Sequence, residues 1–145
     1  MIVVPKNEKE YGVMAMFLQA YAHIAPSADL QLVGWVTDDK LRMVVGLSGF
    51  LGKVCQIHVA MQPGFAFTPQ EMLAGVFKLV FEDFQRETLV GIVNSNNEKA
   101  MKYDLHLGFK EVARLPGMHD DGGDMVVLAL AKADCKYIQR PLEAA

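Results

Sequence analysis

The chain has 145 residues, of which 52% are hydrophobic and 21% are charged, so it can fold as one domain with a sizeable core. Its 14 basic and 17 acidic residues give a net charge of −3 and form no basic stripe, which argues against a nucleic-acid-binding protein. The apolar runs are shorter than the ~18 residues that a membrane span needs. The presence of only two cysteines excludes a disulfide framework, and we expect a cytoplasmic protein whose residues 1–145 form a single domain.

The first half of the chain predicts a helix followed by three strands. Asn7 with Glu10 three residues later is typical of a helix N-terminus, and the helical spacing of apolar residues continues to about Ile24. The apolar residues on one face of this helix are expected to be buried; they are Met14, Phe17, Leu18 and Tyr21. Three segments rich in Val, Leu and Ile follow, separated by short turns, and predict an antiparallel meander. They span residues 30–37, 41–50 and 54–61.

The second half alternates helices with strands. Thr68 followed by Pro69 predicts a helix with Thr68 as its N-cap and Pro69 at its first position. A strand at 89–93 comes next, at a spacing that is typical of a parallel crossover. Asn97 is then expected to begin another helix, which Gly108 ends.

The last part of the chain predicts a hairpin. Segments 109–115 and 125–131 are apolar enough to form strands, and a turn-rich stretch separates them. Together the elements predict an α+β fold, with a mixed, mainly antiparallel sheet of about six or seven strands and helices on both faces.

This order of elements and one local motif resemble the GCN5-related N-acetyltransferase (GNAT) superfamily. The motif N-E-K-A begins at Asn97 and continues to L-G-F at Phe109, which resembles the family's N-x-x-A helix and its closing G-F. The stretch G-D-M-V from Gly123 is similar to the start of the last strand in many small acetyltransferases, including phage-encoded ones. The resemblance implies direct transfer of an acetyl group from acetyl-CoA to an amine on a small molecule or a protein. It also implies a cytoplasmic location, which is the host cytoplasm if a phage encodes the chain.

The resemblance also implies where the cofactor binds. In the family, acetyl-CoA lies in a V between the fourth and fifth strands and pairs with the edge of the fourth. That edge corresponds here to Val59, Ala60 and Met61, and Asn97 begins the helix beside it. These four residues are therefore candidates for cofactor binding.

The phosphate-binding loop departs from the family pattern Q/R-x-x-G-x-G/A, in which backbone N–H groups at a helix N-terminus hold the pyrophosphate. The two glycine positions correspond to Pro69, which has no N–H, and to Glu71, which is negatively charged. Thr68 and Gln70 remain as donor candidates, and we expect weaker CoA binding than in a member with the glycines. Alternatively, this stretch is only a helix cap.

Many family members use a tyrosine on the helix after the fifth strand to protonate the leaving CoA thiolate. Alignment of Asn97 and Gly108 with the motif puts Asp104, not Tyr103, at that position. At about 100° per residue, Asp104 falls within the apolar arc of the helix, where a lone carboxylate is costly unless it is paired or protonated. Asp104 is therefore either a structural hydrogen-bonding group or a proton donor with a raised pKa. Tyr103, at the edge of the arc, is either a packing residue or the alternative donor.

His58 is the candidate general base, because it lies on the fourth strand next to the expected cofactor edge and has a suitable intrinsic pKa. A hydrogen-bonded structural histidine is the alternative. The cluster of His119, Asp120, Asp121 and Asp124 lies in a glycine-containing hairpin loop, so we expect no metal site there. In the family this loop borders the acceptor site, and its acidity suggests a cationic or amine acceptor.

Two functions remain open from the sequence. The first, which we prefer, is an N-acetyltransferase with Asp104, Tyr103 and His58 as catalytic candidates. The second is a protein that kept this fold without catalysis and acts as a binding or structural component, for example in phage assembly. The missing glycines favour the second function, and the inward Asp104 favours the first. The edge strands of the predicted sheet are also compatible with a homodimer.

Overall fold

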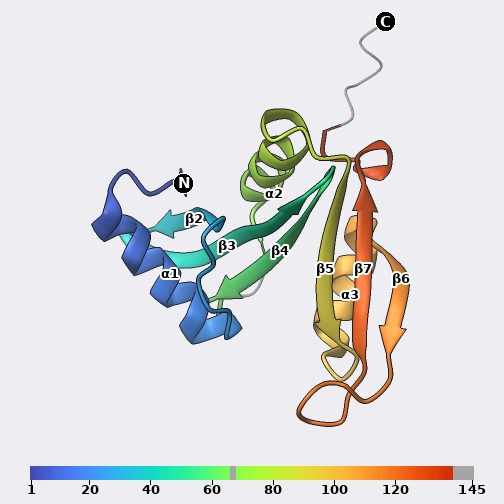
Figure 1. The fold of residues 1–145 in the computed structure, drawn as a ribbon. Coiled ribbons are helices and arrows are strands. Elements are labelled where there is room, and N and C mark those ends of the chain that lie inside the picture. Colours follow the sequence, from blue (N-terminus) through green and yellow to red (C-terminus); the bar gives the residue numbers. More distant parts are fainter. Residues whose placement is uncertain (66–67, 139–145) are drawn as a thin grey trace, which may run out of the picture.

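The computed structural model describes residues 1–65 and 68–138, which form one open sheet with helices on both faces (Figure 1). The strands in this part of the chain are β1 (Ile2–Val3), β2 (Gln31–Thr37), β3 (Lys40–Leu51), β4 (Val54–Met61), β5 (Thr88–Asn94), β6 (Lys110–Leu115) and β7 (Met125–Ala131). The helices are α1 (Glu8–Ala22), α2 (Gln70–Lys78), its π-helical continuation η1 (Leu79–Asp83), α3 (Glu98–Leu107) and the short 3-10 helix η2 (Lys132–Asp134).

The sheet has the strand order β1-β2-β3-β4-β5-β7-β6, and β4 with β5 is its only parallel pair among the described residues. The predicted α+β fold with a mixed, mainly antiparallel sheet is confirmed. The meander and the final hairpin are also where the sequence predicted them. At the turn between β2 and β3, Asp38 and Asp39 have φ values of 53° and 58°, which tight hairpins require and which Asp tolerates.

Two of the three predicted helix caps are confirmed. The side chain of Asn7 accepts a hydrogen bond from the N–H of Glu10 at 2.8 Å. The side chain of Asn97 accepts one from the N–H of Ala100 at 3.1 Å. Gly108 ends α3 with φ 109°, a conformation that favours glycine.

The third predicted cap is wrong, because Thr68 does not cap α2. This helix begins at Gln70, its N-cap residue is Pro69, and no side-chain capping hydrogen bond is found there among the described residues. Thr68 is instead only 6% exposed and forms a side-chain hydrogen bond with Tyr103 of α3. The local sequence pattern assigned the Thr68 hydroxyl to the N-terminus of α2, but in the fold this hydroxyl bonds Tyr103, which is distant in sequence.

Helix α1 covers β2, β3 and β4 on one face of the sheet, and α2 and α3 lie on the other face (Figure 1). The core beneath α1 consists of Met14, Ala15, Leu18, Leu30, Leu32, Val44 and Ala60. Tyr21 was predicted to be buried with this face but is 44% exposed. Its ring packs edge-on against Phe17 at 4.7 Å between centroids, and its side chain lines the cleft described below.

Strands β4 and β5 diverge after a short parallel contact. They pair only at Val54 with Thr88, Cys55 with Leu89, and Gln56 with Val90. Farther along, β4 stays paired with β3 and β5 stays paired with β7, so a gap opens between the two halves of the sheet (Figure 1).

Among the described residues, the divergence leaves one side of the β4 backbone without a strand partner beyond Gln56. The N–H of Gln62 donates to the carbonyl of Arg42 on the β3 side at 2.8 Å. Because an antiparallel strand alternates the direction of its backbone groups, Val59 and Met61 direct their N–H and C=O groups away from β3 and towards the gap. By the same alternation, the backbone of Ala60 pairs with β3.

Candidate functional site

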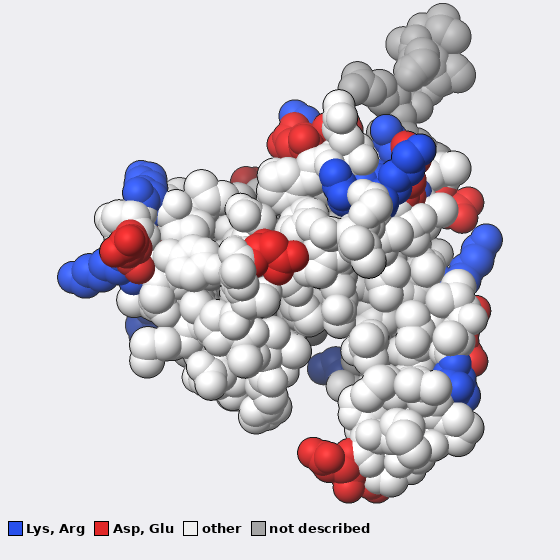
Figure 2. All heavy atoms as spheres, in the orientation of Figure 1, with Lys and Arg blue, Asp and Glu red and all other residues white. Residues whose placement is uncertain are grey.

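The gap between β4 and β5 opens into a cleft with a volume of about 1140 Å³. Common ligand pockets have volumes of roughly 300–1,000 Å³, so this cleft can hold a long ligand. Its walls come from β4, β5, α2, α3, the end of α1 and the loop between β6 and β7. Figure 2 shows its mouth as a notch between the part of the molecule that carries α1 and the part that carries β5, β6 and β7.

Helix α3 contributes two adjacent ionisable side chains to the cleft, Tyr103 and Asp104. Burial raises the pKa of Asp104 to about 6, and no hydrogen bond or ion pair joins its carboxyl to another described residue. Burial also raises the pKa of Tyr103, and the hydrogen bond from Thr68 partly offsets this effect. The phenol therefore stays protonated at neutral pH, whereas the carboxyl titrates close to it.

Strand β4 contributes a histidine on the face that α1 covers. His58 Nε2 lies 2.9 Å from the hydroxyl oxygen of Ser48, within hydrogen-bond distance, and burial lowers the pKa of this imidazole. A lowered pKa keeps the ring neutral at pH 7, which is the form that can accept a proton. His58 also lines the cleft to which α3 contributes Tyr103 and Asp104.

The candidate cofactor residues are only partly brought together. Val59, Met61, Thr68 and Asn97 line the cleft. The side chain of Ala60 is instead fully buried in the core beneath α1, and Gln70 is exposed at the start of α2 without lining the cleft.

Two lysines of α3 stand at the cleft. Lys99 and Lys102 both line it and are exposed, so their ammonium groups are available to an anionic ligand. Glu71, one of the departures from the glycine loop, is exposed in the first turn of α2 and does not line the cleft.

Comparisons with solved structures reveal which fold this is. The ribosomal-protein-S18-alanine N-acetyltransferase of Escherichia coli matches with a TM-score of 0.72 and 16% identity over 90% of this chain and 92% of that one. The spermidine N-acetyltransferase of Vibrio cholerae, solved with CoA and spermine, matches with a TM-score of 0.74 and 11% identity over 96% and 98%. A protein from Desulfovibrio desulfuricans that is described as a putative acetyltransferase of the GNAT family matches with a TM-score of 0.72 and 12% identity over 90% and 98%. The chain has the GNAT acetyltransferase fold.

No protein-family model matches the chain, and neither does any curated protein sequence. The GNAT fold is therefore established by structure alone, which confirms the resemblance drawn from the order of elements and the Asn97 motif.

Some residues of the cleft in this GNAT fold carried no signal in the sequence. The chain has four histidines, His23, His58, His106 and His119, and all four line the cleft. They come from the end of α1, from β4, from α3 and from the loop between β6 and β7, so only the folded sheet brings them to one place. His119 had been noted only as part of an acidic loop.

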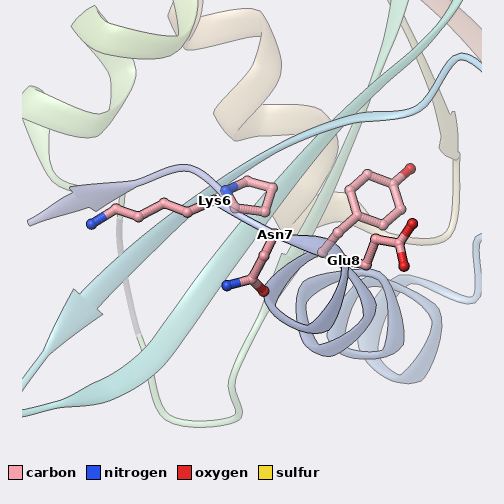
Figure 3. Close-up of a pocket in the computed structure, with 5 residues that line it drawn as sticks. Lys6, Asn7 and Glu8 are labelled. Carbon is pink, nitrogen blue, oxygen red and sulfur yellow. The ribbon is translucent and has the colours of Figure 1, made fainter.

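A second hollow lies at the start of α1, with a volume of about 350 Å³ and a lining that includes Lys6, Asn7 and Glu8. Figure 3 shows the side chains of Lys6 and Glu8 extending in opposite directions. The oxygen of Asn7 is already bonded to the backbone of α1. This hollow therefore has no convergent set of polar groups.

The described residues contain no group of three or more His, Cys, Asp and Glu side chains that could hold a metal ion. In the same part of the chain, no helix is both long and apolar enough to cross a membrane.

Proposed function

We propose that the chain transfers an acetyl group from acetyl-CoA to an amine. The divergence of β4 and β5 carries this proposal, because it combines a long cleft with unpaired backbone groups at Val59 and Met61. A cofactor that contains amide groups can hydrogen-bond such an edge as a third strand would. Tyr103 and Asp104 line the same cleft from α3.

Binding of the phosphates is supported by charge and by helix geometry. Lys99 and Lys102 supply two cations at the cleft, and no side chain of the described residues caps the N-terminus of α2, whose first N–H groups can receive an anion. Asn97 lines the cleft beside these lysines. Pro69 removes one backbone donor from this end of α2, so we expect binding through the remaining amides rather than through a glycine loop.

Acetyl-CoA supplies an acetyl group as a thioester, and the amine nitrogen forms a bond to its carbonyl carbon while the carbon–sulfur bond breaks. The leaving thiolate needs a proton, and we assign its donation to Tyr103, because the raised pKa of the phenol keeps it protonated across the neutral range. Asp104 is the alternative donor, with a pKa of about 6. The pH dependence of kcat distinguishes the two donors. If the proton comes from Asp104, kcat falls above pH 6, where this carboxyl is ionised, whereas Tyr103 stays protonated there and kcat does not fall.

The amine must lose a proton as it is acetylated. We assign its removal to His58, whose lowered pKa leaves the imidazole neutral and able to accept a proton at pH 7. The contact with Ser48 fixes the orientation of the ring.

A second candidate function is a binding or structural protein that kept the GNAT fold without catalysis. Pro69 and Glu71 favour it, because they replace the two glycines of the phosphate loop with a residue that lacks an N–H and a residue of negative charge. This alternative predicts no release of free thiol from acetyl-CoA with any amine.

The test is an assay of acetyl transfer with the purified chain. Acetyl-CoA is incubated with a panel of amines, free thiol is measured over time, and mass spectrometry identifies the acetylated product. We expect product with at least one amine and a loss of about a hundredfold in kcat for Tyr103→Phe. Thiol release without an acetylated amine, or product formation unchanged in Tyr103→Phe, contradicts the assigned chemistry.

A further inference from the structure

The loop between β6 and β7 uses two of its three carboxylates for its own structure. Asp121 accepts hydrogen bonds from the side-chain amide of Asn94 at 3.0 Å and from the N–H of Gly123 at 2.9 Å. Asp124 accepts from the guanidinium of Arg114 and from the N–H of Gly117, each at 2.9 Å. Neither carboxylate lines the cleft, so the acidity of this loop, visible at the lower tip in Figure 2, does not describe the acceptor site.

The loop instead offers His119 to the cleft. The backbone of His119 is held at both ends, since its N–H donates to the carbonyl of Gly123 at 3.0 Å and its carbonyl accepts from the N–H of Gly122 at 2.9 Å. The side chain lines the cleft, and its Nε2 atom is buried without a hydrogen-bond partner among the described residues. Buried nitrogens in folded proteins nearly always have a partner, so this atom is available to bond a water or a ligand bound in the cleft.

The charges of the cleft limit which amine fits beside His119. Of the described residues that line it, Asp104 is the one carboxylate, and Lys99 and Lys102 are cations. Lys99 and Lys102 are assigned to the CoA phosphates, which leaves Asp104, of the described residues, as the one carboxylate of the cleft for an amine. A polyamine would bring several ammonium groups to this single carboxylate, and most of its charges would lose water without gaining a counter-ion. Apolar side chains such as Ile24 and Ile92 form part of the remaining wall.

We propose that the acceptor is a monoamine on an uncharged, partly apolar body, and that His119 Nε2 forms a hydrogen bond with that body. This inference rests on the proposed acetyl transfer and adds the class of acceptor. It also separates the chain from the spermidine N-acetyltransferase that shares its fold, whose structure holds spermine.

The test compares tyramine with spermidine as acceptors at pH 7.5. Binding of acetyl-CoA is measured first by calorimetry, and failure to bind overturns the proposed function itself. With binding established, we expect kcat/KM for tyramine to exceed that for spermidine by about tenfold or more, because desolvation of the additional ammonium groups is poorly compensated in this cleft. Equal or faster transfer to spermidine, or no transfer to tyramine, overturns the inference while leaving cofactor binding intact.

Variants of the loop test the part played by His119. We expect His119→Ala to lower kcat/KM for tyramine by about three- to tenfold, with the KM for acetyl-CoA unchanged and with partial recovery in His119→Gln. Asp120→Ala is the matched control, because Asp120 is the next residue, is exposed and does not line the cleft.

A direct readout is the imidazole Hε1 proton resonance that disappears in His119→Gln. It should shift when tyramine is added to the CoA-bound protein and stay in place when spermidine is added. The titration is made on the original chain, so its result does not depend on whether His119→Ala folds. An unperturbed His119 resonance at saturating tyramine overturns the inference.

Discussion

The hydroxyl of Thr68 is hydrogen-bonded to the phenol of Tyr103, which connects the segment before α2 to the middle of α3. Both residues line the cleft between β4 and β5, and Thr68 is almost fully buried. This bond favours the ionised form of Tyr103 and so keeps its pKa from rising further. The proposed proton donor is therefore positioned by a residue that local sequence patterns assign to a helix cap.

Removal of that hydrogen bond should weaken catalysis less than removal of the phenol. We expect Thr68→Val to lower kcat by about threefold to tenfold, because Tyr103 then loses one hydrogen bond and its orientation. Tyr103→Phe should lower kcat by about a hundredfold. Steady-state kinetics with a saturating amine measures both variants. A larger loss in Thr68→Val than in Tyr103→Phe would mean that Thr68 acts on the substrate directly.

Asp104 should make the stability of the protein depend on pH. Its pKa is raised from 3.8 to about 6 by burial, so the unfolded chain ionises first and the folded state loses stability as pH rises through that interval. Asp104→Asn should therefore be more stable than the original chain above pH 6, by roughly 1–2 kcal/mol once partial exposure to solvent is allowed for. The difference should vanish below pH 4. Urea unfolding at pH 4 and pH 8 measures it, and an equal difference at the two pH values contradicts the account.

Glu71 should oppose the binding of CoA. Replacing it with glutamine removes a negative charge from the first turn of α2, where phosphates are expected, so we expect Glu71→Gln to tighten CoA binding by about two- to tenfold at low salt. Glu71→Gly should have an effect of the same sign. Calorimetry measures both, and Glu8→Gln, in the first turn of α1, is the matched control. Weaker or unchanged binding in Glu71→Gln indicates that the phosphates lie elsewhere.

Gly123 should be required for the shape of the loop that carries His119. A Cβ atom at this position would overlap the side chains of Asn94 and Asn96, so Gly123→Ala must displace the asparagines or the loop. We expect a lower kcat/KM for the amine and an unchanged affinity for CoA, since no residue of this loop is among the candidates for CoA binding. Gly12→Ala in α1 is the matched control, because a Cβ atom there meets no atom within 4 Å. Gly52→Ala would not serve as a control, because its φ of 59° makes any side chain strained. Equal losses in the two variants would mean a general effect of added side chains.

Much of the fold could be predicted because its determinants are local. Strands 54–61 and 125–131 begin and end as predicted, since turn residues flank each apolar run. The caps at Asn7 and Asn97 were also correct, because the bonded N–H lies only three residues away in the chain.

The remainder depended on contacts between distant residues. Thr68 looked like a helix cap because nothing in its neighbourhood indicated a bond with Tyr103. Tyr21 follows the apolar spacing of α1 but lies at the cleft, where it is 44% exposed. His119 could not be placed in the cleft, because the position of its loop is fixed by Asn94 at the end of β5.

The most direct test of the central claim is thermal unfolding of the chain in the presence of acetyl-CoA, with free CoA and ATP as comparisons. A ligand at a hundred times its dissociation constant stabilises the folded state by about 2.7 kcal/mol, which raises the melting temperature of a domain of this size by several degrees. We predict a saturable rise with acetyl-CoA and with CoA, and none with ATP. No rise at millimolar acetyl-CoA would contradict a cofactor site between β4 and β5.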